Sequence, residues 1–447
     1  MKQNANLVCM NPKCKKQFPI KSFQIRCDKC DFLLDVNYEV APSPKLKNVF
    51  YERRNPQGSI YNESGVWRFR ELLNFCEIDT DNLEECSKFL VSLDGAEGRQ
   101  SKPYHMSKVA NFINIDNKNL MLQPEGYNPS GSFKDNGMSS AVTHAKLMGA
   151  TKIICASTGN TSASAGMFAA NENMECDVYI PDGQIAPGKL SQAYQFGTQM
   201  IQISGNFDDA FTKSLEAAKH AGSYTVNSVN PFRIEGQKTI PFRALEFLNW
   251  EVPDWIVYPG GALGNTSSCG KCLMELYKWG WIKKIPRIAV INAEGANTLY
   301  QLYNGKFEDE ELRWNDGAPN LELVEKYYKR MSEDEKLKPK TKATAIQIGK
   351  PANMTKGLRA LEFTDGVVIQ VSDKEMLDGM SAVGLNGFDC EMASGATVAG
   401  IKKLLDSEII KKDDKIVGIL TGRQKEPMLP IEYHNDPNNK FAIPPKS

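Results

Sequence analysis

The chain has 447 residues, and its 54 lysine and arginine residues balance 54 aspartate and glutamate residues. The length exceeds one ordinary core, so we expect two or three domains. The balanced charge gives no field that would favour nucleic acid or an anionic membrane, and the composition, 41% apolar and 24% charged, is typical of a globular protein with small-molecule partners.

The sequence predicts neither a membrane-spanning segment nor a signal peptide. No apolar run approaches the roughly 18 to 20 residues that span a bilayer, and the N-terminal sequence MKQNANLVCMNPKC lacks the hydrophobic stretch of a signal peptide. We therefore expect a cytoplasmic protein. Its 11 cysteines then indicate metal binding where they cluster and core packing where they are scattered.

One such cluster lies in residues 1–40, where Cys9, Cys14, Cys27 and Cys30 form a C-x4-C and a C-x2-C pair. Two turns carrying paired thiolates can complete a tetrahedral zinc site in a segment too small to bury its own core. We expect a zinc-ribbon-like segment with a structural zinc; four unligated thiols are the alternative. Few aromatic residues interleave with its basic residues, which disfavours nucleic-acid binding.

Residues 41–110 read as a partly helical connector, and residues 111–447 alternate strands with helices. Such alternation predicts an α/β fold of two open parallel-sheet lobes, a smaller one at about 137–245 and a larger one at about 111–136 plus 246–447. Residues 304–345 are charged with weak periodicity, which indicates a surface excursion. The expected strands are Lys152–Ala156, Asp177–Ile180, Met200–Ile203, Tyr224–Val226, Trp255–Tyr258, Ile288–Ile291, Val367–Val371 and Ile416–Leu420, with helices at Ser162–Asn171 and Asp208–Ala221.

The string NPSGSFKDNGM, residues 128–138, places Lys134 behind a Gly/Ser turn at the start of a predicted helix. The unpaired N–H groups of a first turn disfavour an ammonium, so the pKa of Lys134 should fall. A free amine there would suit the Schiff-base lysine of a pyridoxal-phosphate (PLP) enzyme. A solvated surface lysine beside Asp135 is the alternative.

Two loops that follow predicted strands have the composition of anion sites. STGNTSAS, residues 157–164, offers hydroxyls and N–H groups at a helix start, although simple helix capping explains it equally well. GGALGNTSS, residues 260–268, has neither a dinucleotide fingerprint nor the lysine of a nucleotide P-loop. It suits a single phosphomonoester such as that of PLP, or it is an ordinary glycine-rich turn.

Two further strand ends complete the set. Thr421 follows a strand, where its hydroxyl would give the pyridine nitrogen of PLP a neutral hydrogen bond. NSVNPFRIEGQKT, residues 227–239, carries Asn227, Ser228 and Arg233, and arginine suits bidentate phosphate recognition. A structural ion pair is the competing interpretation of Arg233.

These four loops, in this order, resemble those of the threonine synthases, a family of fold-type II PLP enzymes with a tryptophan synthase β-like fold. The resemblance runs from about residue 90 to 436 and includes NSVNPFRIEGQKTI, WEVPDW, AVINAEGANTLY, ALEFTDGVV and TGRQKEP. The chain departs from the family pattern at AEGRQSKPY, residues 96–104, where GEGNTPL is usual. It also departs at Asn136, Ala262 and Arg423, where many members carry Arg, Asn and His.

The resemblance implies a role for each matched residue. Lys134 would be the Schiff-base lysine and general acid/base, Asn160 would bond the ring hydroxyl of PLP, and Thr421 would bond its pyridine nitrogen. The phosphate cradle would consist of Gly260, Gly261, Leu263, Gly264 and Asn265. The substrate carboxylate would lie against Ser157, Thr158 and Thr161, and the substrate phosphate against Asn227, Ser228 and Arg233.

The implied activity is that of a carbon–oxygen lyase that converts O-phospho-L-homoserine and water into L-threonine and phosphate, the last step of threonine biosynthesis. Cysteate synthase, which also takes a phosphorylated amino acid, is the nearest alternative on the same fold. A non-catalytic binding protein is the alternative from another class. The fold class makes a homodimer the default assembly.

Overall fold

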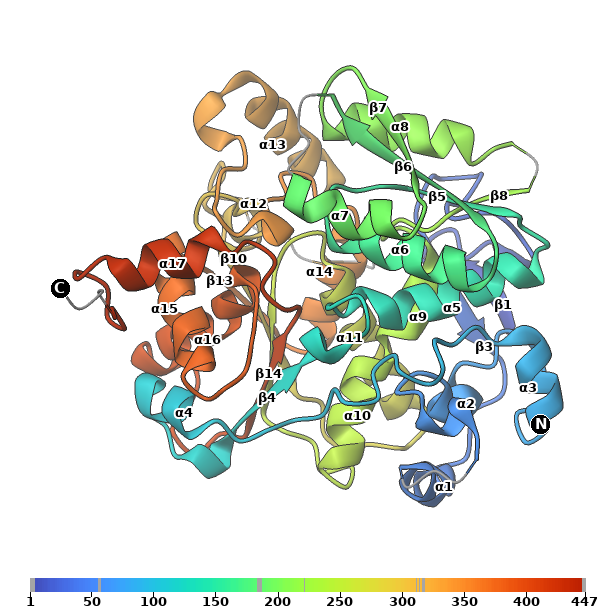
Figure 1. The fold of residues 1–447 in the computed structure, drawn as a ribbon, viewed down its shortest axis with the longest axis horizontal. Helices are drawn as coiled ribbons and strands as arrows, with labels where there is room; N and C mark the ends of the chain where they lie inside the picture. Colours follow the sequence, from blue (N-terminus) through green and yellow to red (C-terminus); the bar gives the residue numbers. More distant parts are fainter. Residues whose placement is uncertain are drawn as a thin grey trace. The chain divides into compact units, whose positions relative to one another are not determined.

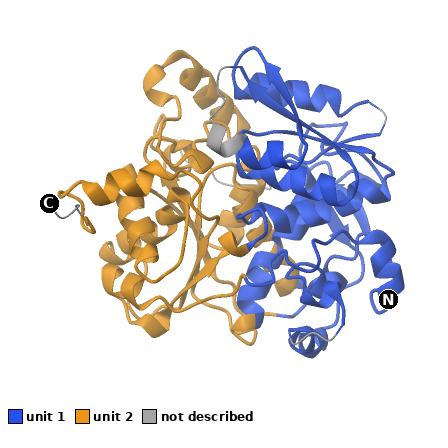
Figure 2. Ribbon diagram, in the orientation of Figure 1, with its two compact units in different colours: residues 1–100, 128–246, 278–281 blue, residues 101–127, 247–277, 282–447 orange. Residues whose placement is uncertain are grey.

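The computed structural model describes residues 5–54, 58–182, 187–220, 222–310, 312, 314–315 and 318–443. The chain forms two compact units (Figure 2). Unit 1 contains residues 1–100, 128–246 and 278–281, and unit 2 contains residues 101–127, 247–277 and 282–447. The N-terminal hundred residues thus belong to the same compact unit as residues 128–246. The expected division into three domains stays a prediction.

Unit 1 contains two sheets (Figure 1). The first is antiparallel, of order β2-β1-β3, and the second is parallel, of order β7-β6-β5-β8. Helices α6 and α8 both pack against β5 and β6. The elements are β1 Ala5–Cys9, β2 Gln17–Pro19, β3 Leu34–Tyr38, α1 Leu46–Arg53, α2 Ile60–Glu63, η1 Trp67–Leu72, α3 Leu83–Phe89, α5 Lys134–Leu147, β5 Lys152–Ala156, α6 Asn160–Asn171, β6 Glu175–Pro181, α7 Pro187–Gln195, β7 Gln199–Ile203, α8 Phe207–Ala217, β8 Ser223–Thr225, α9 Pro231–Gln237 and α10 Thr239–Phe247.

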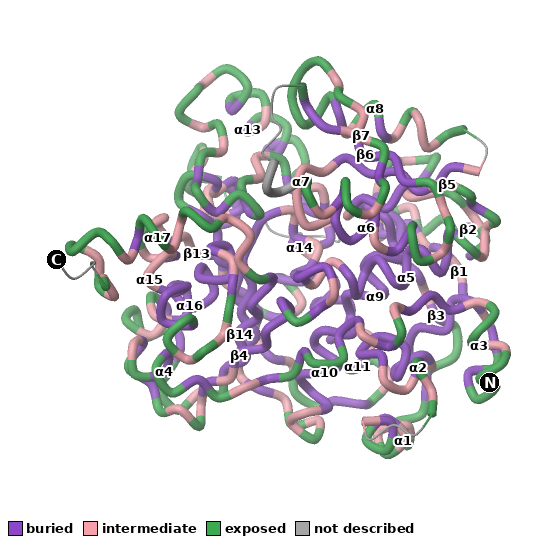
Figure 3. The backbone as a smooth tube through the Cα atoms, viewed as in Figure 1, coloured by how far each residue is buried: buried purple, intermediate pink, exposed green. Residues whose placement is uncertain are grey.

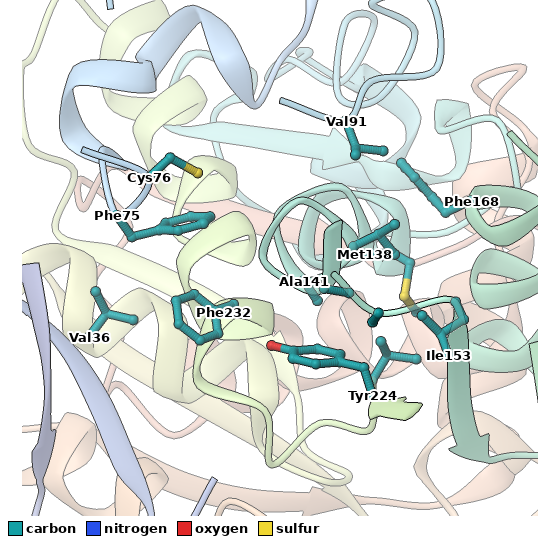
Figure 4. Close-up of a cluster of buried hydrophobic side chains, with 14 of the residues drawn as sticks. Val36, Phe75, Cys76, Val91, Met138, Ala141, Ile153, Phe168, Tyr224 and Phe232 are labelled. Atoms are coloured by element: carbon teal, nitrogen blue, oxygen red, sulfur yellow. The ribbon is translucent and has the colours of Figure 1, made fainter. Parts of the chain in front are cut away.

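The centre of unit 1 is the helix pair α5 and α9, which is buried along much of its length (Figure 3). Every residue of α5 from Asp135 to Ala145 is buried, and so is all of α9. The two helices approach closely at Gly236, where any larger residue would clash. A Cβ there would lie 2.0 Å from the Asn136 carbonyl oxygen. The surrounding apolar cluster joins Val36 of β3 to Phe232 of α9 (Figure 4).

Unit 2 is built on a parallel sheet of order β13-β10-β9-β14-β4. Helix α16 packs against β9, β10, β13 and β14, and α14 packs against β10. The elements are α4 Ser107–Ile113, η2 Asn117–Asn119, β4 Leu120–Pro124, η3 Glu125–Tyr127, β9 Trp255–Pro259, α11 Gly264–Lys278, β10 Arg287–Ala293, α12 Thr298–Tyr303, β11 Trp314–Asn315, β12 Ala318–Pro319, α13 Leu321–Glu333, η4 Glu335–Leu337, η5 Thr344–Ile346, α14 Met354–Phe363, β13 Val367–Val371, α15 Asp373–Gly384, α16 Met392–Asp406, β14 Ile416–Leu420 and α17 Met428–Asn435.

The expected parallel sheets and strand positions are confirmed, with boundaries that differ by up to two residues at either end of a strand. Helix α6 begins at Asn160 rather than at Ser162, and α8 ends at Ala217; residue 221, the expected end of that helix, lies outside the described residues. The expectation of a surface excursion at 304–345 is wrong for α13, whose Leu323, Val324, Tyr327 and Met331 are buried. In the part of the chain that the structure describes, no helix has the length and apolar character needed to cross a bilayer.

Candidate active site

Lys134 is the first residue of α5, as the sequence predicts. The turn before it is closed by Asp135, whose carboxylate accepts hydrogen bonds from the Ser130 backbone N–H at 2.7 Å and the Ser130 hydroxyl at 2.5 Å. Gly131 supplies the left-handed backbone of that turn, with φ +87°. Lys134 is half-buried, and its Nζ lies 4.3 Å from the centre of the Phe133 ring. The turn thus holds a lysine at a helix start against an aromatic face.

The loop after β5 presents Ser157, Thr158, Asn160 and Thr161, all half-buried. The Ser157 hydroxyl accepts a hydrogen bond from the Gly159 backbone N–H at 3.2 Å. Helix α6 starts at Asn160 with no side-chain cap, because its N-cap residue is Gly159. A helix start without a side-chain cap can offer its N–H groups to an anion. The local geometry therefore favours the anion-site interpretation of this loop over simple capping.

Asn227 ties two neighbouring strand ends together. Its Nδ2 donates to the Ala156 carbonyl at 2.9 Å, and its Oδ1 accepts from the Ala156 backbone N–H at 3.0 Å. This double hydrogen bond holds residues 227 and 228, which follow β8, beside Ser157, which follows β5. The structure thus brings the two predicted substrate loops of unit 1 together, with Ser228 half-buried beside Asn227.

Arg233 lies in α9 and is fully buried. Its Nη1 donates to the Val226 carbonyl at 2.8 Å, and among the described residues its Nε and Nη2 have no hydrogen-bond partner. Burial lowers the pKa of Arg233 to about 10, while Cys155 and Asp135 act in the opposite direction. A Cβ at Gly137 would lie 2.7 Å from Nε, so glycine is needed where the guanidinium meets α5. Two buried guanidinium nitrogens without partners are a costly arrangement that an anion would relieve.

In unit 2, the loop after β9 forms a narrow backbone cradle. The Gly260 N–H donates to the Ile291 carbonyl at 2.7 Å, and the Gly260 carbonyl accepts from Asn292 Nδ2 at 2.8 Å. A Cβ at Gly260 would lie 2.6 Å from Val290 and 2.7 Å from Asn292, so this position must be glycine. Leu263 is held at φ +62°, a conformation that is uncommon for a non-glycine residue and frequent at ligand clamps.

The start of α11 completes the cradle. Asn265 and Thr266 are buried in its first turn, where N–H groups lack intrahelical partners. Within the described residues, the Thr266 hydroxyl has no hydrogen-bond partner. A glycine-lined turn, a helix N-terminus and an unused buried hydroxyl are suited to one phosphomonoester group. The residues of this cradle therefore fit the phosphate of PLP.

Thr421 follows β14 and is buried. Its hydroxyl donates to Glu391 Oε1 at 2.8 Å and lies 3.1 Å from the Ser394 hydroxyl, with both partners at the start of α16. Sequence reasoning missed Glu391 and Ser394, and it also missed Asn292, which clamps Gly260. AVINAEGAN, the string that contains Asn292, is part of the family resemblance, whereas the CEMASGA string around Glu391 offered no recognised motif.

The four cysteines near the N-terminus converge. The Sγ atoms of Cys9, Cys14, Cys27 and Cys30 all lie within 4.8 Å of one another. The Sγ atoms are 3.4 Å apart for Cys9 and Cys30, and 3.8 Å apart for Cys14 and Cys27. None of the four forms a disulfide. Four thiols gathered from two turns have the ligand set and the proximity of a structural zinc site.

Comparison with known proteins agrees with these features. Residues 105–422 match the family described as pyridoxal-phosphate dependent enzyme. The threonine synthase of Methanocaldococcus jannaschii is 35% identical over 427 residues, covering 95% of this chain and 94% of that protein. The chain belongs to the threonine synthase family of PLP-dependent enzymes. A second member, from Methanosarcina acetivorans, is 34% identical over 92% of this chain and 90% of that protein.

Solved structures show the same fold at low identity. Threonine deaminase isoform 2 from Solanum lycopersicum superposes with a TM-score of 0.58 at 16% identity, covering 79% of this chain and 93% of that chain. Diaminopropionate ammonia lyase from Escherichia coli superposes with a TM-score of 0.59 at 14% identity, covering 77% of this chain and 89% of that chain. The chain therefore has the fold of the fold-type II PLP enzymes, with its parallel sheets.

Proposed function

We propose that this threonine synthase family member converts O-phospho-L-homoserine and water into L-threonine and phosphate. The observation that supports the proposal is that the chain carries two features suited to binding a phosphate group. One is the glycine cradle at residues 260–264, which fits a cofactor phosphate. The other is the buried Arg233 guanidinium, with two unused nitrogens, which suits a substrate phosphate.

In this proposal, the cofactor-binding residues divide into one that transfers protons and others that hold the cofactor in place. When bound, PLP supplies an electron sink for negative charge that develops beside the substrate amine. The amine of Lys134 would hold the cofactor and then move protons at the α and β carbons of the substrate. Asn160 and Thr421 would orient the cofactor ring. Gly260, Gly261, Leu263, Gly264 and Asn265 would hold its phosphate.

The substrate would be held by two loops of unit 1. Ser157, Thr158 and Thr161 would bind its carboxylate, because they cluster at an uncapped helix start. Ser228 and Arg233 would bind its phosphate, and Asn227 would fix the loop that carries Ser228. Holding the phosphate through a buried guanidinium would also favour its departure from the γ carbon, because the bond to phosphate breaks as negative charge grows on the leaving group.

The decisive experiment measures phosphate and threonine released from O-phosphohomoserine by the PLP-loaded enzyme, beside Lys134→Ala and Arg233→Ala. We expect Lys134→Ala to lose both turnover and the visible absorption band of the lysine-linked cofactor. Arg233→Ala should keep that band and lose affinity for the phosphorylated substrate. Turnover of O-phosphoserine with sulfite, without turnover of phosphohomoserine, would instead establish the cysteate synthase-like alternative.

A structural zinc at Cys9, Cys14, Cys27 and Cys30 is the second part of the proposal. It is supported by the convergence of the four Sγ atoms within 4.8 Å. Elemental analysis of the purified protein should find one zinc per chain, and Cys14→Ser should lose it. Iron bound in place of zinc, or a metal-free protein with full stability, would contradict this assignment.

Two further expectations concern assembly and location. A homodimer rests on the fold class alone, and light scattering of the purified protein tests it. Cytoplasmic location stays a prediction, and fractionation of the source cells tests it.

A further inference from the structure

The four-cysteine segment, residues 1–40, contacts α9, the helix that carries Arg233, directly at Glu235, and it reaches Phe232 of the same helix through His144 of α5. Both contacts lie inside unit 1. They involve Tyr38, the last residue of β3, and Ile20, which follows β2. Neither residue belongs to the proposed metal site or to a predicted substrate loop, so the function described above does not use them.

The first contact joins Tyr38 to Glu235. The Tyr38 hydroxyl donates to Glu235 Oε2 at 2.6 Å, across 197 residues of sequence. The same carboxylate pairs with Lys238 Nζ at 2.6 Å, and both of these side chains are fully buried. A hydrogen bond to a buried carboxylate is among the stronger ones in a protein, because neither partner can turn to water instead. Tyr38 therefore fixes the carboxylate two residues after Arg233.

The second contact joins Ile20 to Phe232 through His144. The His144 Nε2 lies 2.8 Å from the Ile20 carbonyl oxygen, and its ring stacks on Phe232 with centroids 3.5 Å apart and planes inclined by 12°. Phe232 immediately precedes Arg233 in α9 and is buried (Figure 4). The four-cysteine segment thus restrains α9 directly at Glu235 and indirectly, through His144 of α5, at Phe232.

Helix α9 has only seven residues, and its Glu235 pairs with Lys238, the buried residue that follows the helix. A helix of that length is not stable by itself, so its position comes from tertiary contacts. The Arg233 guanidinium must keep its unused Nε and Nη2 aimed at one place to bind a phosphate with two parallel hydrogen bonds.

We infer that the four-cysteine segment is a positioning element for the substrate phosphate, and that Tyr38 is the residue through which it acts. The segment touches neither the reacting atoms nor the cofactor in this scheme. It sets the position of Arg233 by holding Glu235. This inference rests on the proposed role of Arg233 as the phosphate ligand.

The test is Tyr38→Phe, which removes one hydroxyl and keeps the ring. With the PLP-loaded full-length enzyme, we expect the KM for O-phosphohomoserine and the inhibition constant of inorganic phosphate to rise together, by about tenfold, while kcat changes much less. Amide hydrogen exchange in residues 231–237 should accelerate in the free enzyme. The matched control is Tyr303→Phe, which removes an equally buried hydroxyl that donates to the Gly366 carbonyl at 3.1 Å in unit 2.

The outcomes separate the two levels of the proposal. If Arg233→Ala leaves phosphate inhibition unchanged, the proposed role of Arg233 fails. If Arg233→Ala weakens phosphate inhibition but Tyr38→Phe lowers only thermal stability, as Tyr303→Phe does, then Tyr38 is merely structural and the inference is overturned. A coupled rise in the two constants for Tyr38→Phe alone supports it, and faster exchange confined to α9 supports it without any assay of activity.

Discussion

His144 should remain neutral at pH values where ordinary histidines are protonated. It is buried in α5, its Nδ1 lies 2.7 Å from the Tyr224 hydroxyl, and its Nε2 lies 2.8 Å from the Ile20 carbonyl. A carbonyl can only accept, so the neutral ring carries its proton on Nε2 and receives a hydrogen bond from Tyr224. Burial lowers the pKa of His144 from 6.5 to about 4, against the opposing effect of the Ile20 carbonyl.

This lowered pKa makes the folded state sensitive to acid. Below pH 6.5 the unfolded chain protonates this histidine while the folded chain does not, so stability falls as the pH drops. The loss continues until the pH passes about 4, where the folded form also binds the proton. The full difference between 6.5 and about 4 corresponds to about 3 kcal/mol at 1.36 kcal/mol per pKa unit.

The chain's four histidines make the measurement direct. NMR titration of protein carrying ring-labelled histidine should show one imidazole that stays neutral to below about pH 5, and His144→Gln should remove that resonance. The glutamine keeps a donor for the Ile20 carbonyl but does not titrate. Urea unfolding of this variant should therefore depend less on pH between 6.5 and 4 than unfolding of the parent. Four ordinary titrations, or parallel stability curves for the two proteins, would refute the reasoning.

Other predictions concern the cradle and the strand ends. Gly260→Ala should weaken PLP binding by at least about tenfold, because the added methyl would meet Val290 and Asn292 below 3 Å; titration of the apoenzyme by cofactor absorbance measures this. Asn227→Ala should lower the free energy of unfolding by about 2 kcal/mol, because both backbone groups of the buried Ala156 lose their partners. Chemical denaturation checks that loss, and unchanged stability would mean that the strand ends are held together by other contacts.

The sequence predicted the strands of the two parallel sheets except β4, because most of them are short, β-branched runs followed closely by a turn-forming residue. It did not predict α13, since four apolar residues among many charges give a weak pattern until the partners that bury them are known. It also gave no reason to join the connector to unit 1. There, Trp67 and Phe75 are fully buried, and the Trp67 Nε1 donates to the Val91 carbonyl at 2.7 Å.

The candidate site also contains residues that the sequence predicted and residues that it did not. Lys134, Asn160 and Gly260 lie at or next to glycine-containing turns whose composition made them candidates, and the family resemblance then implied their roles. The residues that support them could not be predicted in this way. Asn292 and Glu391 gain a role only because the fold places them beside Gly260 and Thr421, respectively. Tyr38 is the extreme case, since its partner Glu235 lies 197 residues away.

The positions of Lys134 and His144 on α5 explain why the four-cysteine segment should affect phosphate binding more than proton transfer. Lys134 and His144 are ten residues apart on one helix, about 15 Å at 1.5 Å per residue. Because Asp135 to Ala145 are all buried, a disturbance at His144 is resisted by the core before it reaches Lys134. Helix α9 is half as long, and Arg233 lies two residues before Glu235, which Tyr38 of the segment contacts directly. Loosening the segment should therefore move the guanidinium and spare the lysine, which is why a rise in KM is expected without an equal fall in kcat.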